Sequence, residues 1–204
     1  MKKSIVLVLA VVVFAVVVGC SSTNAVSSIK AQDVNVQIEK NSSWESRVGG
    51  VWFSSDGYYY AAGEGYEYTN QKDARASATL AAEQALVSFI NSSIESVVRE
   101  KSTAAGSDSE KQAYQLLTNA VTNSADVVVY GLESYDSKMN ETSKGTYVCY
   151  VLRRVSKDIM EQLISGKLDS MKEVPEYKEN PAFARALEVL ADDNSVVLYT
   201  EKQI

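Results

Sequence analysis

The residue with the clearest chemistry is Cys20, a thiol that directly follows a secretory pattern. Lys2 and Lys3 are positive, residues 5–18 form an uncharged apolar run, and the small Gly19 precedes the cysteine. A basic segment, an apolar segment and a small residue, in that order, are the parts of a signal peptide. Lipid attachment requires a thiol just after the cleavage position. We therefore predict that residues 1–19 are removed and that Cys20 is lipidated.

The apolar run is too short to cross a membrane comfortably. Its 14 residues would span only about 21 Å as a helix, whereas a bilayer core is about 30 Å thick. An ordinary leader with a chance cysteine and an uncleaved anchor are the alternatives. Each buried lipid methylene contributes about 0.8 kcal/mol. Because lipoprotein cysteines usually carry two or three acyl chains, we expect stable attachment to a membrane through Cys20.

Two groups of side chains further along the chain could bind or react. Glu64 and Glu67 are three residues apart, so in a strand they point to opposite faces and do not form a simple acid–base pair. Gly63-Glu64-Gly65 lacks the third glycine of a dinucleotide fingerprint. Four tyrosines of one parity would share a face of a strand, which is either core or a surface for binding peptide, glycan or protein: Tyr58, Tyr60, Tyr66 and Tyr68.

Composition excludes several kinds of chemistry. The chain has no histidine, which excludes histidine triads and most zinc sites. With Cys20 lipidated, Cys149 has no disulfide partner, and we predict that it is a small buried residue. Asp192-Asp193-Asn194 is better interpreted as a helix end than as a metal loop. We predict no catalytic residue, no metal and no cofactor.

The charge balance disfavours nucleic acid as a partner. The sequence holds 20 basic and 26 acidic residues. Removing Lys2 and Lys3 with the leader leaves 18 against 26, a net charge of −8. An acidic chain without a basic patch is a poor ligand for phosphates.

The elements that must position these residues fit one domain after a tether. Cleavage leaves 185 residues, 204 minus 19, which suffice for one domain. Residues 20–50 are predicted to be a flexible tether with an r.m.s. span near 30 Å, in which the alternating Val34, Val36 and Ile38 allow a short edge strand. Residues 51–204 are predicted to be the folded domain.

The middle of the chain predicts a strand followed by a long helix. Asp56-Gly57 is a hairpin signal, and the aromatic residues 58–68 favour a strand. From residue 71 to about 101 the pattern is helical, with an alanine stripe on one face. Gly63 and Gly65 would let that helix approach the strand closely. The alanines of the stripe are Ala74, Ala78, Ala81 and Ala85.

The remaining chain predicts a hairpin and three further helices. Ser107 and Glu110 form a capping box for a helix to about residue 123. Strands over 126–135 and 146–152, with a turn at 139–145, should pair antiparallel. Helices are predicted over about 156–163, ending near Gly166, and from Pro181, with 195–200 as a last short strand or a loose tail. The fold class is α+β: a small antiparallel sheet packed by one long helix, with additional C-terminal helices.

Four short motifs between residues 60 and 152 carry a resemblance to a known family: Ala62-Gly63-Glu64-Gly65, Asp73-Ala74-Arg75-Ala76, Val127-Val128-Val129-Tyr130-Gly131 and Gly145-Thr146-Tyr147-Val148. With these motifs, residues 60–152 resemble the Lpp-twenty lipoprotein family, to which flagellar assembly protein P and the N-terminal region of flagellar assembly protein T are related. The resemblance implies an α+β core at about 58–155 on a lipid anchor, with a helical extension over 156–204 and no catalytic residues to transfer. Members look like envelope components, some of them associated with the flagellar basal body.

We therefore expect a non-enzymatic envelope lipoprotein that binds or scaffolds a protein partner, with the tyrosine face as the candidate surface. Ser21 and Ser22 after the cysteine resemble the outer-membrane sorting default of two-membrane bacteria, with the domain facing the periplasm or the cell surface. One alternative is an activator of a cell-wall synthase. Another is a hydrolase of envelope glycans, which would need two carboxylates about 5 to 10 Å apart in a cleft. The oligomeric state stays open.

Overall fold

The structure is a computed structural model that describes residues 44–175, 177, 179–192, 196, 197 and 200. The leader, Cys20, the alternating Val34–Ile38 segment and Asp193-Asn194 lie outside the described residues. In chain order the elements are η1 (Trp44–Arg47), β1 (Val51–Phe53), β2 (Tyr58–Tyr68), α2 (Gln71–Ala104), α3 (Asp108–Asn123), β3 (Glu133–Glu141), β4 (Tyr147–Ser156), α4 (Lys157–Lys172) and α5 (Pro181–Asp192).

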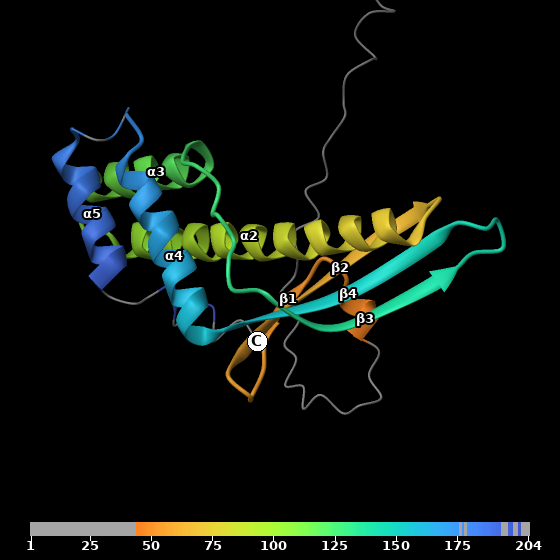
Figure 1. The fold of residues 1–204 in the computed structure, drawn as a ribbon. Helices are drawn as coiled ribbons and strands as arrows, with labels where there is room; N and C mark the ends of the chain where they lie inside the picture. Colours follow the sequence, from red (N-terminus) through yellow and green to blue (C-terminus); the bar gives the residue numbers. More distant parts are fainter. Residues whose placement is uncertain (1–43, 176, 178, 193–195, 198–199, 201–204) are drawn as a thin grey trace, which may run out of the picture. The chain divides into compact units, whose positions relative to one another are not determined.

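The four strands form one antiparallel sheet in the order β1-β2-β4-β3. Helix α2 lies along one face of this sheet, and α3, α4 and α5 gather around the C-terminal part of α2 (Figure 1). The predicted fold class, an α+β domain with one long helix on a small antiparallel sheet and further C-terminal helices, is confirmed. Among the described residues, no helix is both long and apolar enough to span a bilayer.

Helix α2 has two halves that pack against different parts of the domain. Asn70 caps its start by accepting a hydrogen bond from the Asp73 amide at 2.9 Å. The first half buries alanines against the sheet, including Ala82 where the sequence pattern predicted Ala81. The second half buries larger side chains, from Leu86 to Val98, in the main core with α3, α4 and α5. The small residues therefore let the first half of α2 lie close to the sheet, and the large residues fill the space between its second half and the main core.

Gly63 and Gly65 bring α2 and β2 into direct backbone contact, as predicted. A Cβ at Gly63 would lie 2.0 Å from the Ala78 carbonyl oxygen and 2.4 Å from the Ala82 amide nitrogen. A Cβ at Gly65 would lie 2.0 Å from the Ala74 carbonyl oxygen. These distances are far below van der Waals contact, so only glycine fits at either position.

The capping box that starts α3 is also confirmed. The Ser107 hydroxyl accepts a hydrogen bond from the Glu110 amide at 3.3 Å, and the Glu110 carboxylate accepts one from the Ser107 amide at 3.2 Å. Two otherwise unpaired amides of the first turn are thereby satisfied.

The predicted strand over 126–135 is wrong for residues 126–132, because β3 begins only at Glu133. Residues 125–132 run as an extended connection outside the sheet. Val127, Val129 and Leu132 pack against the main core, while Val128 is 82% exposed. The β-branched run that favoured a strand therefore belongs to a connection that packs on the main core. Gly131, near the end of this connection, has a φ of +71°.

The hairpin forms as predicted, but β3 begins later and reaches further than expected. Its outer strand comprises residues 133–141, and the turn lies at Thr142–Thr146 rather than at 139–145. β3 is the edge strand, and its residues are exposed apart from the half-buried Met139. Polar residues suit an exposed edge strand. They are equally typical of a turn, and for that reason a turn was predicted at residues 139–145.

The C-terminal helices differ from the prediction in their extent. α4 continues through Gly166 to Lys172, because Leu168 and Met171 extend its buried face. A glycine inside a helix costs only about 1 kcal/mol. α5 starts at Pro181 as predicted. The described residues of the last segment, Val196, Val197 and Thr200, are helical rather than part of a strand.

A buried lysine on α4 offers a test of the core. Lys167 is 1% exposed, and its ammonium group donates a hydrogen bond to the Ala125 carbonyl at 3.1 Å. Burial lowers the pKa of Lys167 from its ordinary 10.5, with Asp126 opposing the shift. We expect Lys167→Met to raise the free energy of unfolding at pH 7 by about 1 kcal/mol, because a desolvated cation is removed. In this variant the Ala125 carbonyl oxygen keeps the hydrogen bond from the Ser170 hydroxyl, which has a length of 3.4 Å.

The pH dependence of stability should change in the same variant. Below the lowered folded pKa the lysine is protonated in both states, and its burial penalty is present in full. As pH rises from that pKa to 10.5, the folded state has lost the proton that the unfolded state still binds, so stability rises. Urea unfolding across this range should show the rise in wild type and not in Lys167→Met. The exposed Lys172→Met is the control, expected within about 0.5 kcal/mol of wild type.

Candidate functional site: the outer face of the sheet

The sheet face opposite α2, here called the outer face, carries a second and smaller apolar cluster. Trp52 on β1 and Tyr60 on β2 are cross-strand partners, and their rings stack with centroids 5.9 Å apart. Ala62 and Leu152 complete the buried part of this cluster. Trp52 is 8% exposed and Tyr60 0% exposed. The tyrosine stripe predicted from the sequence therefore lies partly in a core.

Three of the four predicted tyrosines share the outer face, with very different exposure. Tyr60 is buried, Tyr58 is half-buried at the edge of the cluster, and Tyr66 is 63% exposed. Of these three tyrosines on the outer face, Tyr66 is thus the one that an approaching partner can reach most freely. The Tyr60 hydroxyl donates to Asp56 at 2.6 Å, and burial, followed by this hydrogen bond, raises the pKa of Tyr60 well above its ordinary value.

Tyr68 does not lie on the outer face, so that part of the prediction is wrong. The register advances from Gly65 opposite Cys149 to Tyr68 opposite Tyr147, which places an extra residue in β2. Glu67 takes the strain of this bulge with a φ of +55°. The bulge turns Tyr68 to the α2 side, where its hydroxyl donates to Ser77 at 3.0 Å. A bulge reverses the parity on which a stripe is predicted.

The short helix η1 lies across the outer face (Figure 1). The Trp44 indole packs against the apolar cluster and donates a hydrogen bond to Asp136 on β3 at 2.9 Å. Glu45 forms an ion pair with Lys138 on β3. The Arg47 guanidinium lies over the Trp52 ring, 5.0 Å from its centroid. Residues 44–47, assigned from the sequence to the tether, thus contact the sheet.

Next to η1, aromatic and arginine side chains alternate on the same face. Arg154 lies over the rings of Tyr58 and Tyr135, at 4.3 and 5.2 Å from the centroids, and pairs with Glu133 at 3.0 Å. Tyr135 meets Tyr60 edge to face at 5.1 Å and is 49% exposed. Rigid aromatic and arginine side chains are typical of protein-binding surfaces.

Two buried polar atoms at the contact of η1 with the sheet find no hydrogen-bond partner among the described residues. They are the Trp52 Nε1 atom and the Glu45 Oε2 atom. Buried donors and acceptors are nearly always satisfied in stable cores. The contact between η1 and the outer face therefore leaves one donor and one acceptor unused within the described part of the chain.

Sequence reasoning missed Trp44, Trp52, Tyr135 and Arg154 as members of this site. The available signal was the placement of two tryptophans, the only ones in the chain, on either side of Gly49-Gly50. A polar tether has no reason to end in a tryptophan. The arginine and tyrosine come from the hairpin, whose register could not be inferred from the sequence.

The two carboxylates considered as a catalytic pair are engaged separately. Glu64 lies opposite Tyr150, and a hydrogen bond to Glu64 is the main cause of the raised pKa of Tyr150. Glu67, in the bulge, lies 3.3 Å from the Lys144 ammonium group in the hairpin turn.

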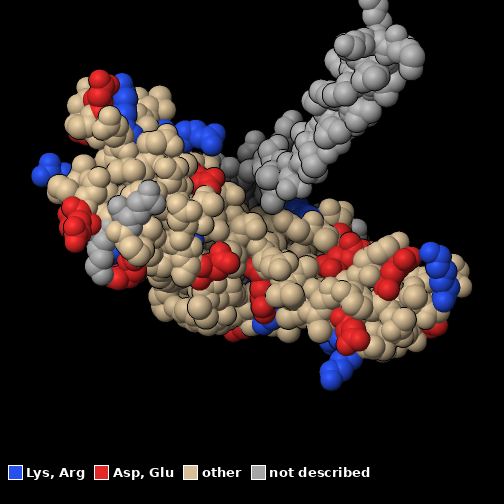
Figure 2. Space-filling view, turned by 90° about the horizontal axis from the view of Figure 1, so that it is seen from above, with Lys and Arg blue, Asp and Glu red and all other residues tan. Residues whose placement is uncertain are grey.

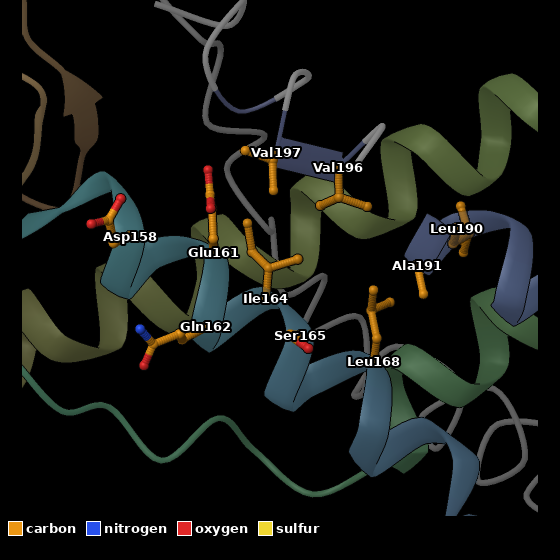
Figure 3. A pocket seen from close by; sticks show the side chains of 10 residues that line it. All are labelled: Asp158, Glu161, Gln162, Ile164, Ser165, Leu168, Leu190, Ala191, Val196 and Val197. Atoms are coloured by element: carbon orange, nitrogen blue, oxygen red, sulfur yellow. The ribbon is translucent and has the colours of Figure 1, made fainter. Parts of the chain in front are cut away.

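A cavity of about 540 Å³ lies between α4, α5 and the residues around Val196. Its floor is aliphatic, and Asp158 and Glu161 lie at the end formed by the first turns of α4 (Figure 3). Glu161 is also 4.0 Å from Lys157. Neither Glu64 nor Glu67 lines this cavity. The lining residues are Asp158, Glu161, Gln162, Ile164, Ser165, Leu168, Leu190, Ala191, Val196 and Val197.

Cys149 is a small buried residue, as predicted. It is 0% exposed, lies in the cluster beneath α2 and is free. Burial raises the pKa of its thiol, which disfavours the reactive thiolate. Within the described ranges, no three histidine, cysteine, aspartate or glutamate residues are grouped as a metal site would require.

Charged side chains of both signs are interspersed on the face seen in Figure 2.

Comparisons of the chain with protein-family models, curated proteins and solved structures gave no match.

Proposed function

We propose that this chain is a non-enzymatic bacterial envelope lipoprotein that is anchored through lipid on Cys20 and binds a protein partner. The observation that carries the proposal is the order of the first twenty residues: Lys2-Lys3, an uncharged apolar run, then Gly19-Cys20. Ser21 and Ser22 support placement in an outer membrane, with the domain facing the periplasm or the cell surface.

The resemblance to the Lpp-twenty family supports an envelope role and extends the proposal to an association with the flagellar basal body. Its carrying residues include Gly63 and Gly65, whose missing side chains have a clear packing reason. An activator of a cell-wall synthase is the alternative, and it differs from the first proposal in the partner rather than in the anchoring.

The outer face is the described surface on which we place partner binding. Tyr66, Tyr135 and Arg154 offer rings and a guanidinium on strands that are paired within the sheet. Side chains held this way lose little conformational entropy on binding, which favours affinity.

Photo-crosslinking in intact cells tests this proposal. A photoreactive phenylalanine analogue in place of Tyr66 is expected to give an adduct of defined mass with an envelope protein. The same analogue in place of Leu80, which is 54% exposed on α2, is the matched control and should give none. Mass spectrometry of the adduct distinguishes a flagellar basal-body protein from a cell-wall synthase. Adducts at Leu80 without adducts at Tyr66 would contradict the assigned surface.

A further inference from the structure

The segment Trp44–Arg47, here called the strap, covers part of the outer face. The part that it covers, here called the strap site, comprises Asp136, Lys138 and the apolar cluster around Trp52 and Tyr60. We propose that the strap site is a docking site for a partner segment that presents an aromatic N–H donor followed by a carboxylate, and that the strap is its resident substitute. This inference rests on the proposed function, since it names the kind of protein segment that the chain would bind.

The strap site is complementary to the strap at three separate points. Asp136 accepts the indole N–H of Trp44 at 2.9 Å, and Lys138, two residues further along β3, pairs with Glu45. Between these strand residues and β1 lies the apolar cluster against which the Trp44 ring packs. An acceptor, a cation and an apolar floor in this order define a ligand with a donor-bearing ring and an adjacent acid.

Trp44, Glu45 and Arg47 contact the sheet through their side chains. The strap is a single 3-10 turn of four residues, and none of them is fully buried. Such a turn is not stable by itself in water. The strands beneath keep their own ladder, with Val51, Trp52 and Phe53 paired to β2. The strap can therefore leave without breaking the sheet.

The link between strap and sheet has hinge-like residues. Val48-Gly49-Gly50 connects η1 to β1, and Gly49 has a φ of +78° with open space where a Cβ would stand. Its amide donates to the Ala62 carbonyl at 2.9 Å, which fixes the hinge on β2. Rotation about these glycines would move Trp44 while β1 stays in place.

The incomplete contact gives a partner room to bind better than the strap does. While the strap is seated, the Trp52 Nε1 atom has no acceptor and the Glu45 Oε2 atom has no donor among the residues that the structure describes. A partner segment with one more acceptor near Trp52 would satisfy the first atom. Removal of the strap would release the second atom to water.

The covalent link sets how strongly the strap competes. A segment on a short linker has an effective concentration on the order of millimolar. The apparent affinity of any competing segment is the intrinsic affinity multiplied by the fraction of molecules in which the strap site is open. Opening the strap by substitution should therefore raise the affinity for an added segment without changing the strap site.

A peptide-exchange experiment tests this directly. The probe is a fluorescently labelled peptide with the sequence of residues 41–50, and the protein is the purified full chain in detergent micelles. The peptide is expected to bind Trp44→Ala saturably in fluorescence anisotropy and to bind wild type roughly tenfold more weakly or worse. A second strap-opening variant, Glu45→Lys, places a cation against Lys138 and should also bind the peptide.

Matched changes test the assigned contacts. Adding Asp136→Ala to the Trp44→Ala chain should weaken peptide binding roughly fivefold, as the loss of one hydrogen bond does. A peptide in which the tryptophan is replaced by alanine should not bind. Circular dichroism and thermal unfolding establish that each variant is folded.

Several results would overturn the inference. They are a folded Trp44→Ala and a folded Glu45→Lys that both fail to bind the peptide, equal binding by wild type, and equal binding of the alanine peptide. Because this measurement uses only the purified chain and its own segment, its failure leaves partner binding in the envelope standing. Conversely, a lack of crosslinks at Tyr66 in cells would not affect it.

Discussion

Replacing Cys20 by serine is expected to abolish the incorporation of a labelled fatty acid into the protein. Serine lacks the thiol that accepts the lipid, and each lost methylene removes about 0.8 kcal/mol of membrane binding. Two acyl chains together contribute on the order of 20 kcal/mol. No other expected effect on this protein is larger. Metabolic labelling, followed by the mass of the mature protein, measures it.

The control for this change is Cys149→Ala. Cys149 is the other cysteine of the chain, and it is buried beneath α2, so its replacement should leave labelling unchanged. Membrane fractionation alone does not decide the question, because an uncleaved leader keeps its apolar run. If Cys20→Ser still gave a labelled protein of unchanged processed mass, the lipid-anchor proposal would be wrong.

Gly63→Ala is expected to lower the free energy of unfolding by about 3 kcal/mol or more, the largest effect expected in the folded domain. The added methyl would lie 2.0 Å from the Ala78 carbonyl oxygen and 2.4 Å from the Ala82 amide nitrogen. These are backbone atoms of α2, so the helix itself must move away from the sheet. Overpacking of this kind costs about 1–3 kcal/mol even where side chains can yield. Chemical denaturation measures the loss.

The same change at Gly166 is the matched control and should have the opposite sign. Gly166 lies inside α4, and a Cβ there meets no atom within 4 Å. Alanine in a helix interior is favoured over glycine by about 0.5–1 kcal/mol, so Gly166→Ala should stabilise the protein. Equal stability of Gly63→Ala and wild type would mean that α2 and β2 are not in backbone contact.

The parts of the fold that follow from local chemistry could be predicted from the sequence. The long helix starts at a capping asparagine and shows its buried stripe in the spacing of alanines. The glycines at 63 and 65 indicated which strand face it would approach. The capping box at Ser107 and Glu110 needs only four residues to form, so it too could be predicted.

The parts of the fold that depend on pairing between distant residues could not be predicted from the sequence. The β-branched run at Val127–Val129 favours an extended chain whether that chain joins a sheet or packs across the main core, and only the tertiary contacts decide. The bulge at Glu67 places Tyr68 on the other face of the sheet. Its mark is a single positive φ angle, which the sequence does not reveal. The strap was hidden because its contacts with Asp136 and Lys138 span more than ninety residues.

Helix α2 joins the two apolar clusters on its side of the sheet. Its 34 residues give a helix about 51 Å long, and the sequence places no proline or glycine inside it. One end packs on the glycines of β2 and the other lies in the main core. A substitution that displaces the first half of α2 from β2 is therefore expected to disturb the packing around its second half as well.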